Sequence, residues 1–205
     1  MSGFDECIDR MRRGDIEGTL AKLNVARMLF LNQVPFRFVI PKGIKKKDYD
    51  FDILFPNGYV ACADAKCKIE QTIFSEGGIK NGLKAAREQL PNDKPGIIFI
   101  KTPQHWLSDE SFRTRALLIV QRFLGGVKRI VSVKFYVEPI SFADNVMRID
   151  LGYREVSNPK TDFGKSRRLE FVQKHDLPPK ANGMPPHYKR IILSRFRIRR
   201  PNGQE

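Results

Sequence analysis

The run from Gly96 to Ile100 limits the choice of fold more than any other part of the sequence. It is short, rich in β-branched residues and without alternation of polar and apolar side chains, as expected of a strand that is buried on both faces of a sheet. Before it, apolar residues recur every three to four positions from Ile79 to Leu90, a spacing that predicts a helix. A buried strand directly after an amphipathic helix favours the α/β class.

The residues before that helix add one more helix and three strands. Apolar residues at helical spacing predict a long, largely buried helix over residues 15–33, ended by Pro35. A short strand is expected over residues 36–40. Two longer strands, over 50–55 and 59–68, flank Pro56-Asn57-Gly58, which is a strong turn signal and predicts a hairpin.

The second half of the chain extends this pattern. A third helix is expected from an N-cap at Ser108 to Gly125-Gly126. Strands over 129–137 and 146–156 either extend the sheet or form a hairpin beside it. Residues 188–200 fit an arginine-edged strand and a disordered basic tail equally well. We therefore predict an α/β fold with a mixed central sheet flanked by helices (core order αβββαβ), a domain over 1–157 and a basic C-terminal extension over 158–205.

The charge of the chain indicates a polyanionic partner. Its 205 residues carry 37 Lys and Arg against 23 Asp and Glu, a net +14, and residues 160–205 contribute 12 Lys and Arg against 4 Asp and Glu. Basic side chains that neutralise phosphates release counterions from nucleic acid. The expected nucleic-acid contacts are basic residues in two clusters: Lys45, Lys46, Lys47, Arg195, Arg197 and Arg199. Solvated tails and ribosomal-type proteins have the same composition.

Other sequence signals narrow the location and the chemistry. Apolar runs such as residues 28–31 are far short of the ~20 residues of a membrane span. No secretory signal pattern is present, and the three cysteines lack CxxC spacing, so we expect a cytoplasmic protein without membrane contact. The GxxxxGK[ST], GxSxG and HExxH motifs are absent from the sequence.

The chemistry is concentrated between Asp50 and Lys68. Alternate side chains of a strand share a face, so Asp64 stands beside Lys66, and the turn brings Asp52 of the preceding strand against them. Asp50 lies on the same face and competes with Asp52 as the first acid. Hard cations prefer oxygen ligands, so Asp52, Asp64 and the Ala65 carbonyl are expected to bind Mg²⁺ or Mn²⁺.

The pattern of Asp52, eleven residues and then Asp64-Ala65-Lys66, in its order of helices and strands, resembles the PD-(D/E)xK nuclease superfamily, which has the restriction-endonuclease-like fold. The resemblance covers residues 15–101. It implies Mg²⁺-dependent cleavage of nucleic acid, with use in restriction, repair, recombination or mobile-element biology. We expect an endonuclease that acts on DNA rather than RNA. It leaves open a homodimer, since many such nucleases cut both strands as dimers.

The resemblance also assigns residues. Asp52 matches the first acid, Asp64 the second acid and Lys66 the motif lysine. Gln89 resembles a glutamine that some members place in the next helix, and Glu17 is the nearest match to a glutamate on the first helix. Each has a plainer reading: a surface ion pair for Asp64 and Lys66, a turn-entry acid paired with residues 45–47 for Asp50 or Asp52, an ordinary helix residue for Gln89, and an acid that complements the helix dipole for Glu17.

Two other functions fit the same features. A non-catalytic nucleic-acid-binding protein could use this fold as a platform, and a basic structural protein such as a ribosome-associated factor would carry a similar charge. Metal-dependent cleavage separates the nuclease from both.

Overall fold

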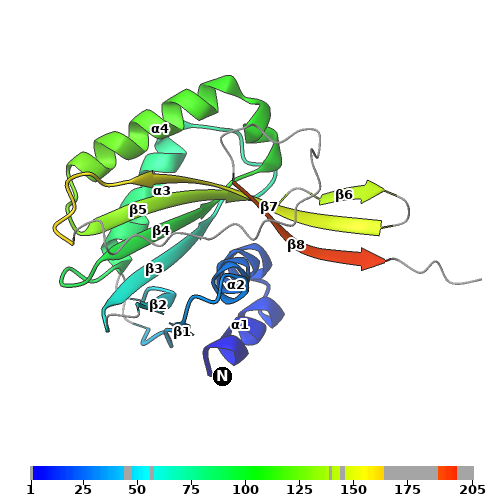
Figure 1. The fold of residues 1–205 in the computed structure, drawn as a ribbon, viewed down its shortest axis with the longest axis horizontal. Helices are drawn as coiled ribbons and strands as arrows, with labels where there is room; N and C mark the ends of the chain where they lie inside the picture. The colour runs from blue at the N-terminus through cyan, green and yellow to red at the C-terminus, as the bar shows by residue number, and fades with distance from the viewer. Residues whose placement is uncertain are drawn as a thin grey trace, which may run out of the picture.

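A computed structural model describes residues 2–43, 48–55, 58–138, 140–143, 146–163 and 189–197. One β-sheet lies at the centre, with helices on both faces (Figure 1). One face is covered by α1 (Ser2–Arg12) and α2 (Ile16–Leu31), and the other by α3 (Glu76–Gln89) and α4 (Glu110–Gly125). None of the helices in this described part has the length and apolar character needed to cross a membrane.

The strands form a mixed sheet in the order β1-β2-β3-β4-β5-β7-β6, with β8 also paired to β7. Strands β3, β4 and β5 run parallel, and the other pairs are antiparallel. The strand bounds are β1 Phe36–Phe38, β2 Phe51–Leu54, β3 Val60–Cys67, β4 Gly96–Lys101, β5 Ile130–Val137, β6 Ile140–Ala143, β7 Val146–Ser157 and β8 Lys189–Arg197. This arrangement confirms the predicted α/β class.

Two hydrophobic cores explain why the central strands show no alternation. On the α2 face, Val25 and Leu29 pack with Ile97 of β4, while on the α3 and α4 face Leu83 and Val120 pack in the same core as Ile98. All residues of β5 are buried as well. Successive residues of β4 therefore enter opposite cores, and both cores need apolar side chains there.

The structure differs from the predictions at two helices. The N-cap of α4 is Asp109 rather than Ser108, because its Oδ1 accepts hydrogen bonds from the backbone N–H groups of Ser111 and Phe112. Ser108 ends a short 3₁₀ helix, η1 (Gln104–Ser108). Helix α1 was not predicted. It packs so closely on β1 that a Cβ at Gly3 would lie 2.1 Å from Phe38 Cβ.

Most of the predicted hairpin lies within the described residues. Strands β2 and β3 pair antiparallel, and Gly58 has a φ of +79°, which glycine adopts most readily. The turn residues Pro56 and Asn57 lie outside the described part, as do Lys45, Lys46, Lys47 and Arg199. Of the two interpretations of residues 188–200, the strand is the one observed, over Lys189–Arg197.

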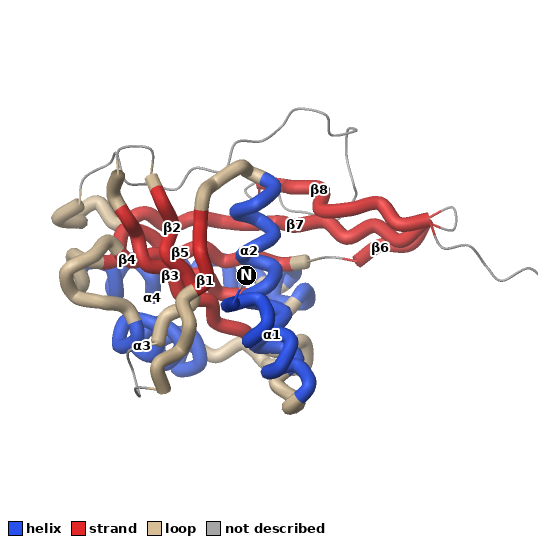
Figure 2. Tube along the Cα trace, turned by 90° about the horizontal axis from the view of Figure 1, so that it is seen from below, coloured by secondary structure: helices blue, strands red, loops and turns tan. Residues whose placement is uncertain are grey.

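Strand β7 extends beyond the body of the protein. Its residues 152–157 pair with β5, and its residues 146–151 continue past the last residue of β5, flanked by β6 and β8. We call β6, residues 146–151 of β7 and β8 the ribbon. Figures 1 and 2 show it projecting past the helices. Because β5 is parallel to β3 and β4, the ribbon leaves the sheet at the edge where those strands end.

Candidate active site

The start of β2 and the C-terminal half of β3 bring two carboxylates together. The register pairs Asp52 with Cys62 and Phe51 with Ala63, so Asp50, one residue before β2, lies beside the Asp64-Ala65-Lys66 segment. The Asp50 N–H donates to the Ala63 carbonyl at 3.0 Å, and Asp50 Oδ2 accepts from the Ala65 N–H at 2.8 Å. Of the two acids, Asp50 and Asp52, it is therefore Asp50 that two hydrogen bonds hold beside the Asp64-Ala65-Lys66 segment.

Asp64, Lys66 and Gln89 form one connected group on the α3 face of the sheet. Asp64 is only 1% exposed, and its Oδ2 lies 2.8 Å from Lys66 Nζ. The same ammonium group donates a hydrogen bond to Gln89 Oε1. Gln89 reaches this position because it is the last residue of α3, which is held on the sheet by its buried Ile79, Leu83 and Ala86. The structure thus joins three of the predicted site residues.

Lys22 is a site residue that the sequence analysis missed. It lies on α2, is 4% exposed, and places its Nζ 3.3 Å from Asp50 Oδ1. Its Nζ also lies 5.7 Å from the ring centre of Phe38 and 5.9 Å from that of Phe51, within cation–π range. The sequence did contain a clue: Lys22 precedes Val25 by three residues and Ala26 by four, so it lies on the face of α2 that is buried. Asp50 is thereby held by α2 as well as by β3.

Burial, and after it the negative charge of Asp50, raise the pKa of the Asp64 carboxyl to about 7. The ammonium groups of Lys66 and Lys22 act in the opposite direction but do not offset these effects. A carboxyl group whose ionised form is disfavoured by burial and by a second acid gains most from a cation placed between the two.

Asp52 lies one residue pair away from this group and has partners of its own. It is 4% exposed, opposite Cys62. Its Oδ2 accepts from Arg37 Nε at 2.8 Å, and its Oδ1 accepts from the Tyr49 hydroxyl at 2.9 Å. Burial, together with the hydrogen bond to Asp52, raises the pKa of Tyr49. The structure brings Asp52 together with Arg37 and Tyr49, whereas Asp50 is joined to the Asp64 segment.

Glu17 is exposed in the first turn of α2. It contributes to the environment of Cys67, the last residue of β3, whose pKa is raised to about 11 mainly by burial. Lys101 lowers the pKa of Cys67, and Glu17 and Glu70 raise it. Glu17 therefore lies near the end of β3, and within the described residues no hydrogen bond or ion pair joins it to Asp50 or Asp64.

The donor set for a metal is made of oxygens. In the part of the chain that the structure covers, no three His, Cys, Asp and Glu side chains group as a metal site. The available ligands are the carboxylates of Asp50 and Asp64 and the carbonyl of Ala65, which lies between Asp64 and Lys66. One or two carboxylates completed by water and a substrate phosphate is the usual Mg²⁺ arrangement, so these residues fit that ion.

Comparison of the sequence with models of known protein families finds no match, and comparison with curated proteins finds none either.

Proposed function

We propose that this protein is a metal-dependent nuclease that hydrolyses phosphodiester bonds in DNA. The observation that carries the proposal is the meeting of Asp50 and Asp64 with Lys66 and Gln89 at the end of β3. Two carboxylates beside one ammonium provide both cation ligands and positive charge for a phosphate. The first acid of this proposal is Asp50, in place of Asp52.

Asp50, Asp64 and the Ala65 carbonyl would hold Mg²⁺ or Mn²⁺. When bound, such an ion lowers the pKa of a coordinated water and stabilises the charge that develops on the phosphate. The buried Lys22 beside Asp50 keeps that carboxylate against β3. Lys22 positions Asp50 and does not contact the phosphate, because its ammonium group faces Asp50 and two aromatic rings.

Lys66 acts on the reacting phosphate. Its ammonium group lies at the Asp64 carboxylate, and Gln89 accepts one of its hydrogen bonds, so the direction of the group is set by two elements. A fixed positive charge that interacts most strongly with the transition state raises the rate rather than the ground-state affinity.

The test is cleavage of DNA with Mg²⁺, with Mn²⁺ and with EDTA. Wild-type protein should cleave only with a divalent cation, and Lys66→Ala should lower the rate by on the order of 10²-fold or more while DNA binding is kept. Lys80→Ala is the matched control, because Lys80 is an exposed lysine of α3 paired with Glu76. Circular dichroism and melting curves should match for all three proteins.

Two outcomes would count against the nuclease. Cleavage that persists in Lys66→Ala would mean a contaminant or another site. If single-stranded, duplex and branched DNA and also RNA bind but stay intact, the result would favour the non-catalytic binding platform. That second function is supported by the presence of only two carboxylates in the group among the described residues.

A further inference from the structure

The register of β7 with β8 gathers arginine positions on one face of the ribbon. Arg148 pairs with Arg195, Val146 with Arg197, and Gly152 with Arg190. Residues that pair directly in an antiparallel ladder share a face, and so do positions two apart along a strand. Four arginine positions therefore share one face, of which the sequence analysis had named only Arg195 and Arg197.

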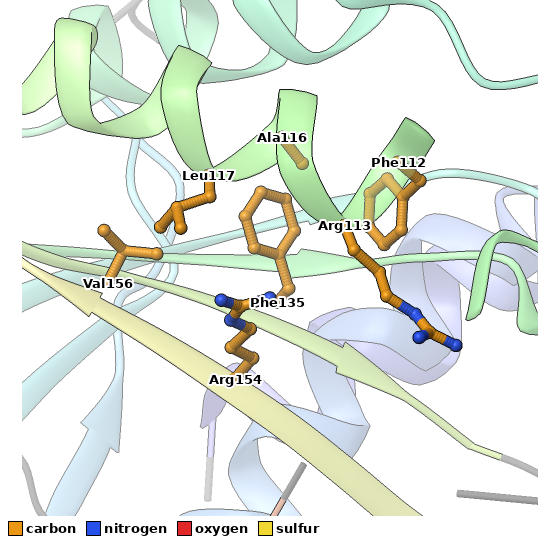
Figure 3. A pocket seen from close by; sticks show the side chains of 7 residues that line it. All are labelled: Phe112, Arg113, Ala116, Leu117, Phe135, Arg154 and Val156. Atoms are coloured by element: carbon orange, nitrogen blue, oxygen red, sulfur yellow. The ribbon is translucent and has the colours of Figure 1, made fainter. Parts of the chain in front are cut away.

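This face is continuous with the α4 side of the sheet. Arg154 and Val156 of β7 belong to the same alternating set as Arg148, and Val156 packs in the core that α4 covers. Arg154 lines a small pocket together with Arg113 of α4. Figure 3 shows both arginine side chains in the space between α4 and β7, beside Phe135. The arginine positions thus form a track from Arg113 to the end of the ribbon.

The opposite face of the ribbon has a different composition. Met147 pairs with both Phe196 and Phe142, and Ile149 pairs with Ile140. The aromatic positions of the ribbon therefore lie across from the arginine track and not on it. Proteins that bind single strands combine basic residues with aromatic side chains on which bases stack. A basic face without aromatic positions suits the phosphate backbone of a duplex.

The arrangement of charges also calls for an anion. Like charges directly opposite each other on neighbouring strands destabilise a sheet, and Arg148 stands opposite Arg195. Asp150 is the one acidic position of β7 on this face in the described ribbon, so the face keeps a net positive charge. Phosphates of a bound ligand would add negative charge to this face.

We propose that this track, formed by Arg113, Arg154, Arg190, Arg148, Arg195 and Arg197, is a docking surface for the backbone of double-stranded DNA. The ribbon leaves the sheet at the edge where β3 ends, so the track and the candidate active site share that edge. Strands β4 and β5 separate β3 from β7, a distance of about 14 Å at the usual strand spacing. One stretch of duplex can therefore reach both. The choice of DNA as ligand rests on the proposed function.

The experiment measures binding of a fluorescent 20-base-pair duplex in EDTA across a range of NaCl concentrations. Arg148→Gln with Arg195→Gln should lower the slope of log affinity against log salt by about 2, and the affinity by on the order of 10- to 100-fold at 0.1 M salt. The control is Arg12→Gln with Arg13→Gln, which removes the same charge from exposed residues at the C-terminal end of α1. The control should keep the wild-type slope.

A second variant protects the test against a ribbon that fails to fold. Arg113→Gln with Arg154→Gln changes the other end of the track, at the pocket under α4, and should also lower the slope by about 2. Wild-type slopes in both double variants, equal losses in the α1 control, or tighter binding of single-stranded DNA or RNA would overturn the proposal.

Cleavage is assayed separately with Mg²⁺, so that the two proposals fail separately. If the protein cleaves DNA and both double variants bind DNA as tightly as wild type, the docking-surface proposal fails and the nuclease proposal stands. If both double variants lose DNA affinity but no protein cleaves DNA, the docking-surface proposal stands and the nuclease proposal fails.

Discussion

Two buried clusters of charge lie on opposite faces of the same sheet, and they differ in what they cost the fold. On the α2 face, Lys134 of β5 pairs in register with Glu155 of β7, with 2.7 Å between Nζ and Oε2, and its ammonium lies 5.6 Å from the ring centre of Tyr153. On the α3 face, Asp64 lies near Asp50, and its pKa is raised although Lys66 and Lys22 are close.

Equal numbers of positive and negative side chains in a buried cluster do not by themselves determine what the cluster costs in folding free energy. In the first cluster, one cation faces one anion across a strand pair, so the pairing itself compensates for much of the burial. In the second, one carboxyl is almost fully buried beside another acid, and its ionised form is disfavoured. A cost of this kind is typical of sites kept for function rather than for stability.

The largest effect is expected where the compensated pair is broken. Glu155→Ala should lower the free energy of unfolding by about 3–5 kcal/mol, because the buried Lys134 would lose its ion pair with Glu155. Urea unfolding followed by circular dichroism measures it. Replacing both residues, by Lys134→Met with Glu155→Leu, should recover most of the loss. A loss below about 1 kcal/mol in Glu155→Ala would show that the ion pair with Glu155 does little to offset the burial of Lys134.

The second cluster should respond with the opposite sign. Asp64→Asn should raise the free energy of unfolding of the metal-free protein by about 1–3 kcal/mol at pH 8. The folded protein binds the Asp64 proton more tightly than the unfolded chain does, since the pKa is raised to about 7 from 3.8. This group therefore makes stability fall as pH rises from 4 to 7.

Unfolding curves of wild type and Asp64→Asn between pH 4 and pH 8 measure that contribution as a difference. The gap should be smallest near pH 4, where the carboxyl is protonated in the folded protein and still partly protonated in the unfolded chain, and greatest above pH 7. A variant that is less stable than wild type at every pH would mean that the Asp64 carboxylate stabilises the fold.

Helices and strands were predictable where a local pattern decides them. The unalternating run of β4 and the apolar spacing of α3 reflect burial that the sequence carries within a few residues. Helix α1 was missed although Phe4, Cys7, Ile8 and Met11 recur at helical spacing, and it buries little beyond Gly3 and Cys7. The close contact of Gly3 with Phe38 is a tertiary feature.

The site was predictable in part for the same reason. Asp64, Lys66 and Gln89 follow from strand alternation and from a helix that packs on the strand. The relation of Asp50 and Asp52 to Asp64 depends on the register of β2 with β3, since both acids alternate onto one face. Lys22 was visible as a lysine within an apolar stripe, but its partner lies 28 residues away and is set by the packing of α2 on the sheet.

The central claim is that Asp50 and Asp64 together form the cation site, and titration calorimetry with Mn²⁺ on three matched variants tests it most directly. Asp50→Asn and Asp64→Asn should each abolish the binding seen in wild type. Asp52→Asn should keep it, because that carboxylate is held by Arg37 and Tyr49. Binding that survives in Asp50→Asn or Asp64→Asn, or is lost only in Asp52→Asn, would contradict the claim.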